Sequence, residues 1–159
     1  MDARAPEWQS PGVSGVPSQT VELVWRGDER FDAVTPSGIE VAIDGTRETG
    51  ISPVEALAVA LGACMGTDVV DILKKGREDL TGCRIRVDGD RRETPPRRFT
   101  SIRLAIELTG WSLSRAKAER AVQLSRDTYC SVWSSMAPDI DLNVELELHE
   151  PLLAKGEAG

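Results

Sequence analysis

Hydrophobic and polar residues alternate along several stretches of the chain, as they do in strands that bury one face. In residues 140–148, an aliphatic residue stands at every second position, and acidic or amide residues fill the gaps. Residues 102–109 and 82–92 repeat this alternation, and residues 20–43 contain three shorter runs separated by turn sequences. The pattern predicts a small three-stranded meander followed, later in the chain, by three longer strands.

A long helix is predicted between the meander and the longer strands. The sequence Ser-Pro-Val-Glu at 52–55 is a typical helix start, because Ser52 can cap the first turn, proline suits the first helical position and Glu55 can bond back to the cap. The helix is expected over about 53–75, and its first half is almost entirely apolar, so that half should be buried on most sides. A second helix is expected over about 112–127.

The order of these elements indicates an α+β fold, in which helices cover one face of antiparallel or mixed sheets. We expect a disordered tail over 1–19, the meander over 20–50, and one cooperative domain over 51–150 that contains the central helix and the βαβ-type unit after it. The chain has few other elements that could pack around this central helix, and this also favours a homodimer.

The net charge of −7 argues against two classes of partner. Binding to nucleic acid or to an anionic membrane depends on an excess of Lys and Arg, whereas this chain has 26 acidic and 19 basic residues. The longest apolar run, 56–66, has 11 residues, fewer than the roughly 20 that span a bilayer. The first residues lack the basic segment and apolar core of a signal peptide. These features favour a cytoplasmic protein.

The residues present exclude several common kinds of catalytic site. His149 is the single histidine and ends a strand on its polar face, so a Cys-His or Ser-His nucleophile is hard to build. One histidine and three scattered cysteines also lack the usual spacing of zinc ligands, and phosphate-binding glycine motifs do not occur. No metal or cofactor is therefore expected. Thiol chemistry, carboxylate chemistry and binding remain.

Some candidate groups have a simple structural explanation. Cys83 alternates in phase with Ile85 and Val87, which is typical of a small apolar core residue. The capping motif accounts for Glu55, although a catalytic carboxylate there stays open. The arginines of 91–98 are typical of a solvated turn, because this segment also contains two prolines.

Cys64 and Cys130 are harder to assign. Cys64 lies about 18 Å along the predicted helix from its start, beyond the reach of the helix dipole. Asp68 and Asp71 follow on the same helix face, where their negative charges oppose a thiolate. Cys130 would favour a thiolate if Ser131 caps a short following helix. The residues alone leave both packing and reactivity open for the two cysteines.

Two segments around these cysteines resemble a known family. The segment GISPVEALAVALGACMGTDVVDIL resembles the central helix of the OsmC/Ohr superfamily, and ERAVQLSRDTYCSV resembles its second-cysteine motif. The segment RRETPPRRFTSIRL between them is similar to the hairpin of the YhfA-like branch of that superfamily. The resemblance covers about residues 20–150.

The resemblance implies both a fold and an activity. The fold is OsmC-like, with antiparallel or mixed sheets wrapped around a long central helix, in an intertwined homodimer. The activity is that of a stress-response, thiol-dependent peroxidase that reduces organic hydroperoxides. Cys64 would attack the peroxide as a thiolate and become a sulfenic acid, Cys130 would condense with it to a disulfide, and a dithiol reductant would reopen that disulfide.

Peroxidases of this family activate the first thiol with an arginine and a glutamate. The glutamate directly follows the helix-start proline, but this position is Val54, and Glu55 is rotated from it by about 100° on the helix. Arg47 and Arg30 are the candidate arginines. An apolar hydroperoxide is the expected substrate, because the residues around Cys64 are apolar.

Two other functions stand beside the peroxidase. A non-catalytic dimer of the same fold would bind a small apolar ligand near the cysteines, and a slowly alkylated Cys64 would favour it. A structural dimer whose cysteines only pack would lose no hydrogen atoms on mild peroxide treatment.

Overall fold

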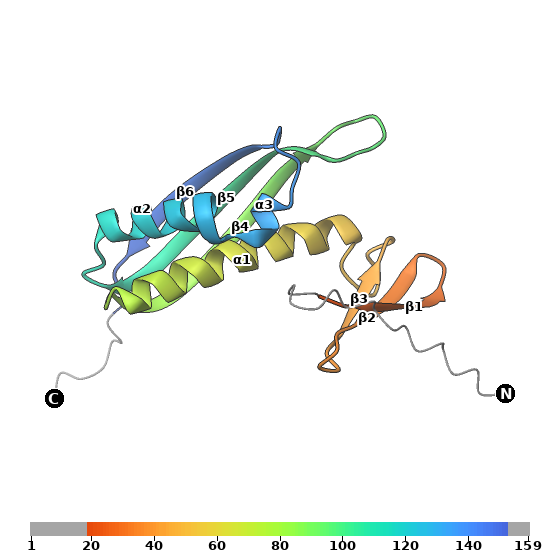
Figure 1. Ribbon diagram of the computed structural model, residues 1–159, viewed down its shortest axis with the longest axis horizontal. Helices are drawn as coiled ribbons and strands as arrows, with labels where there is room; N and C mark the ends of the chain where they lie inside the picture. The colour runs from red at the N-terminus through yellow and green to blue at the C-terminus, as the bar shows by residue number, and fades with distance from the viewer. Residues whose placement is uncertain (1–18, 153–159) are drawn as a thin grey trace, which may run out of the picture. The chain divides into compact units, whose positions relative to one another are not determined.

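The chain divides into two compact units, Met1–Ala56 and Leu57–Gly159, and the computed structural model describes residues 19–152 (Figure 1). Nearly all of the predicted tail over 1–19 lies outside the described residues. The boundary between the units falls at the end of the first turn of the long helix, so most of that helix belongs to the second unit.

The first unit contains the predicted meander. Strands β1 (Glu22–Gly27), β2 (Arg30–Val34) and β3 (Glu40–Asp44) form an antiparallel sheet in that order, which confirms the prediction. Gly27 has a φ of +101°, a conformation that glycine adopts without the strain of a side chain, at the tight turn between β1 and β2. One face of the sheet leaves large apolar side chains exposed: Leu23, Trp25, Phe31 and Val41.

The long helix α1 spans Pro53–Lys75, as predicted, and the capping motif forms. The Glu55 backbone N–H donates to Ser52 Oγ at 3.3 Å, and the Ser52 N–H donates back to Glu55 Oε2 at 2.8 Å. By length and composition α1 is apolar enough to cross a membrane, yet it is the core helix of this fold, and the sheet covers one side of it. The 11-residue run noted in the sequence therefore understated its apolar length.

The second unit is built on a mixed sheet with the order β4-β5-β6 (Figure 1). β4 (Asp79–Arg91) and β5 (Phe99–Trp111) are antiparallel, whereas β5 and β6 (Asp141–His149) are parallel. The crossover between β5 and β6 carries α2 (Arg115–Leu124), a π-helical turn (Ser125–Tyr129) and the short α3 (Ser131–Ser134). The predicted mixed α+β fold is confirmed.

A dry core forms where α1 lies on this sheet. Every fourth residue of α1 from position 61 to 73 is buried, and so is every second residue of β5 from position 102 to 108. Glycines at 62 and 66 let the helix approach β4 closely, because a Cβ at Gly62 would lie 3.0 Å from Val87 Cγ2. The buried positions of the helix and strand are Leu61, Met65, Val69, Leu73, Ile102, Leu104, Ile106 and Leu108.

Three expectations from the sequence are corrected. Cys83 does share a face with Ile85, but it is exposed, because β4 is an outer strand and the helix leaves this position open. The second helix starts at Arg115 rather than near 112, because Ser114 is the residue that caps it, accepting from the Lys117 N–H at 3.4 Å. The first half of α1 is not buried on most sides in the single chain, since Leu57 and Val59 are 42% and 58% exposed.

Candidate functional site

The second unit brings Cys64 and Cys130 together, although 66 positions separate them in the sequence. Their Sγ atoms and a carboxylate oxygen of Asp68 all lie within 4.8 Å of one another. We call these three residues the Cys–Asp–Cys cluster.

Helix geometry places two members of the cluster on one face of α1. Asp68 follows Cys64 by four residues, about one turn, so both side chains point the same way. Cys64 is half-buried. Ser125, which is fully buried at the start of the π-helical turn, donates from its Oγ to Asp68 Oδ2 at 2.8 Å. This hydrogen bond joins α1 to the segment that carries the second cysteine.

The π-helical turn positions Cys130. The Cys130 N–H donates to the carbonyl of Ser125, five residues earlier, at 2.8 Å. A π-turn adds a residue to the helical repeat and changes the direction in which the next side chain points. The backbone then becomes extended at Cys130, whose Sγ accepts from the Trp133 N–H at 3.4 Å and caps α3. The sequence suggested Ser131 as the cap, and the structure corrects this to Cys130.

The two cysteines differ in their electrostatic surroundings. Cys130 is 1% exposed, and this burial raises its pKa to about 11, although the backbone N–H groups of Trp133 and Val132 act in the opposite direction. The expectation that a helix amino terminus would favour a Cys130 thiolate is therefore wrong, because desolvation outweighs the N–H donors. At neutral pH Cys130 is a protonated thiol, and Cys64 is the more accessible sulfur.

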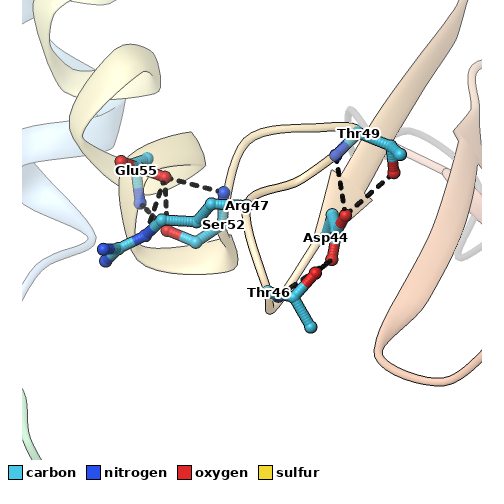
Figure 2. Close-up of polar contacts among 6 residues, drawn as sticks. All are labelled: Asp44, Thr46, Arg47, Thr49, Ser52 and Glu55. Atoms are coloured by element: carbon cyan, nitrogen blue, oxygen red, sulfur yellow. Dashed lines mark hydrogen bonds and ion pairs between the residues drawn. The ribbon is translucent and has the colours of Figure 1, made fainter.

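Glu55 and Arg47 belong to a polar cluster of the first unit (Figure 2). Glu55 Oε2 accepts from both the N–H and the Oγ of Ser52, at 2.8 and 2.6 Å, and Arg47 Nε lies 3.4 Å from the same oxygen. The bonds from Ser52 hold the pKa of Glu55 below its usual value. Arg30 instead pairs with Asp28 at 3.6 Å. The capping explanation of Glu55 is thus confirmed.

A buried aspartate organises the loop that carries Arg47 (Figure 2). Asp44 is completely buried and accepts four hydrogen bonds, from the N–H and Oγ1 of Thr46 at 2.8 and 2.7 Å and from those of Thr49 at 2.9 and 2.8 Å. These donors hold the pKa of Asp44 far below its usual range. Sequence reasoning missed this residue, although an aspartate followed by threonines at positions +2 and +5 is a readable signal.

Sequence reasoning also missed the partners of the cysteines. In the sequence, Asp68 stands out only as a charge on the helix face, and Ser125 has no distinguishing pattern. The spacing of four residues from Cys64 to Asp68 could have identified the first. Nothing local could have identified Ser125, because it reaches Asp68 across 57 positions of the chain.

Comparison with known proteins gives consistent matches. Residues 45–145 match the family model described as OsmC-like protein. Protein YhfA of Escherichia coli strain K12 is 40% identical over 109 residues, which are 68% of this chain and 81% of YhfA.

Solved structures match over most of the chain. A hypothetical protein from Aquifex aeolicus VF5 has a TM-score of 0.79 at 31% identity, covering 86% of this chain and all of that one. The organic hydroperoxide resistance protein OhrB of Bacillus subtilis has a TM-score of 0.55 at 19% identity, covering 80% of this chain and 98% of that one. The second likeness is one of fold.

Proposed function

We propose that this chain, which belongs to the OsmC-like protein family, is a cytoplasmic thiol-dependent peroxidase that reduces organic hydroperoxides. Family membership and the likeness to hydroperoxide resistance proteins support a peroxide-related redox role. The observation that carries the proposal is the approach of Cys64 Sγ and Cys130 Sγ to within 4.8 Å.

In the first step, Cys64 attacks the hydroperoxide. Its thiolate sulfur bonds to the terminal peroxide oxygen, the O–O bond breaks, and the alkoxide leaves as an alcohol after it takes up a proton. Cys64 becomes a sulfenic acid. Cys64 is the better nucleophile of the pair, because it is half-buried whereas Cys130 is buried and protonated at neutral pH.

In the second step, Cys130 resolves the sulfenic acid. Its sulfur bonds to Cys64 Sγ, the S–O bond breaks, and the hydroxide leaves as water with the Cys130 proton. Asp68 is close enough to both sulfurs to accept that proton on its way to the leaving group. A disulfide needs an S–S distance of about 2.05 Å, so the sulfurs must move together by less than about 3 Å. A dithiol then reduces the disulfide by exchange.

The single-chain surface supports a homodimer as the working form. Proteins of this family are commonly dimers. In the second unit, α1 and β4 border an open, mainly apolar groove of about 510 Å³ that includes Ala63, Val70 and Ile85. Val59, one helical turn before Ala63, is exposed and extends this apolar surface along α1. A second copy of the chain is the occupant that would bury this surface.

The test measures consumption of cumene hydroperoxide in the presence of dithiothreitol. We expect turnover by the wild type, loss to the background rate in Cys64→Ser, and an unchanged rate in Cys83→Ser, because Cys83 lies outside the cluster. Cys130→Ser should still consume at least one equivalent of peroxide, since the first step needs only Cys64. Equal rates for the wild type and Cys64→Ser would exclude the proposal.

A non-catalytic dimer that binds a small apolar ligand is the second candidate. Two observations favour it. In the first unit, Glu55 accepts from Ser52 and pairs with Arg47, and in the second unit the carboxylate of Asp68 lies beside Cys64, where its negative charge opposes a thiolate. The rate of Cys64 alkylation as a function of pH distinguishes the peroxidase from the non-catalytic dimer. A peroxidatic thiol ionises, and is therefore alkylated rapidly, below about pH 8.5, whereas an unactivated thiol is alkylated slowly there.

A further inference from the structure

We infer that Cys64, Asp68 and Cys130 also form a binding site for a thiophilic divalent cation, and that Zn²⁺ is the ion that suits it best. The three donor atoms lie within 4.8 Å of one another in the ligand-free chain. Zinc binds thiolate sulfur at about 2.3 Å and carboxylate oxygen at about 2.0–2.2 Å, so neighbouring ligands of a tetrahedral site stand roughly 3.3–3.8 Å apart. A contraction of about 1 Å or a little more would close the set.

The donor types select the metal. Two thiolates and one carboxylate suit zinc and related soft or borderline ions, whereas magnesium and calcium require oxygen ligands. Three protein ligands leave the fourth tetrahedral position to water, as in zinc sites that remain open to exchange. In the bound state the ion would offset the repulsion among the two thiolates and the carboxylate in a partly buried position.

Neighbouring groups already hold the donors in place. Ser125 Oγ donates to Asp68 Oδ2 at 2.8 Å, which holds the carboxylate in place beside the two sulfurs. The Trp133 N–H donates to Cys130 Sγ and stabilises a negative sulfur. Hydrogen bonds to the ligands are a regular feature of protein metal sites, because they orient the donor atoms.

This site differs from the sequence-based expectation that the chain binds no metal. The spacing of the cysteines along the sequence does not reveal the site. One ligand, Asp68, is a carboxylate one helical turn after Cys64, and the third ligand, Cys130, comes from a segment that is distant in the sequence. Metal binding does not depend on peroxidase activity, although the two would use the same sulfurs. Binding requires both thiols to lose their protons, so two protons are released for each ion bound.

Oxidation and metal binding are mutually exclusive at this cluster. A hydroperoxide that oxidises the two zinc-bound thiolates would take up two protons, form the Cys64–Cys130 disulfide, and yield one alcohol, one water and the free ion. The disulfide removes two of the three ligands. The cluster would therefore hold zinc only in its reduced state.

The test titrates the reduced full-length chain with Zn²⁺ against a chromophoric zinc chelator. We expect one ion per chain for the wild type, and the same affinity for Cys83→Ser and Asp71→Asn, which change a cysteine and a helix aspartate outside the cluster. Cys64→Ser and Cys130→Ser should lose the ion, and Asp68→Asn should bind it at least about tenfold more weakly. Equal affinity of Asp68→Asn and the wild type would overturn the three-ligand site.

A second measurement needs no variant. Cobalt added to the reduced wild type should produce the intense thiolate-to-cobalt band and the visible absorption of a tetrahedral site, and disulfide formation with diamide should abolish both. Absence of the thiolate band in the reduced chain, or its survival after oxidation, would also overturn the inference. Neither readout involves peroxide turnover, so failure of the metal site and failure of the peroxidase proposal are separable.

Discussion

At the residue scale, the same side-chain type takes different chemical roles in different surroundings. Cys130 is buried and stays protonated, Cys64 is half-buried beside Asp68, and Cys83 is exposed on an outer strand. The surroundings of Asp44 and Asp68 also differ. Asp44 is enclosed by four donors, whereas Asp68 shares its surroundings with two sulfurs and accepts from one buried serine. Neighbouring atoms, rather than residue identity, decide which groups hold a charge.

The buried Asp44 makes stability depend on pH. Its pKa is lower in the folded chain than in the unfolded chain, where it is about 3.9, so its contribution to stability is present above about pH 4 and is lost as the pH falls toward the folded pKa. We expect Asp44→Asn to lower the free energy of unfolding at pH 7, and the difference from the wild type to shrink at pH 3. Urea unfolding at both pH values measures it.

Asp28→Asn is the matched control for this prediction. The Asp28 side chain is 83% exposed and lies 3.6 Å from Arg30, so the exchange should change stability little at either pH. A loss for Asp44→Asn that is as large at pH 3 as at pH 7 would show that the hydrogen-bonded charge is not the cause.

At the element scale, the segment between β5 and β6 decides whether the two cysteines meet. The sequence predicts a helix continuing to about 127, but the α-helix ends at Leu124 and a π-helical turn follows. The hydrogen bond between Ser125 and Asp68 ties this turn to α1. The π-helical turn, rather than α2 or α3, therefore sets the direction in which the Cys130 side chain points, toward Cys64.

Ser125→Ala tests this link. It removes a buried donor to a carboxylate, which should lower the free energy of unfolding by about 1–2 kcal/mol, because Asp68 is half-buried and water can replace part of the bond. Urea unfolding measures the change. Ser134→Ala, an exposed serine of α3, should change stability by less than about 0.5 kcal/mol.

A double-mutant cycle with Asp68→Asn isolates the contact itself. If the effects of Ser125→Ala and Asp68→Asn simply add, the hydrogen bond contributes nothing, and the prediction fails.

At the scale of the whole molecule, apolar surface left open by one chain argues for a partner. The sheet of the first unit exposes Leu23 and Trp25, and α1 exposes Leu57 and Val59 in the second unit. Leu23 and Trp25 share one face of that sheet, and exposed apolar patches of this kind are typical of interfaces between subunits. Proteins of this family are commonly dimers, and the homodimer proposed above would bury such surface.

Val59→Glu should shift a dimer toward the monomer, because it would place a charge on the apolar surface of α1. Sedimentation velocity at micromolar concentration measures the shift. Leu152→Glu makes the same kind of exchange at a residue that is 99% exposed, and it should leave the dimer intact. A wild type that sediments as a monomer would contradict the proposed assembly.

Much of the architecture was predictable, because it depends on local signals. Alternation over 140–148 and 102–109, and the capping motif at Ser52, specify strands and a helix start through neighbours that lie within a few residues. Cys64 and Cys130 were identifiable as a pair only through the resemblance to a family. Cys83 shows the limit of predictions from periodicity. The alternation of residues places Cys83 on the correct face of its strand, but it does not predict that the side chain is exposed on an outer strand.

The sequence by itself determined the helices, the strands and the residue types available for chemistry: three thiols, one histidine and many carboxylates. The tertiary structure alone decided which of them lie close together. Desolvation of Cys130, the bond from Ser125 to Asp68 and the approach of two sulfurs all depend on segments that are distant in the chain. Local pattern carries no information on such distances, because burial and electrostatic interaction are set by atoms in space.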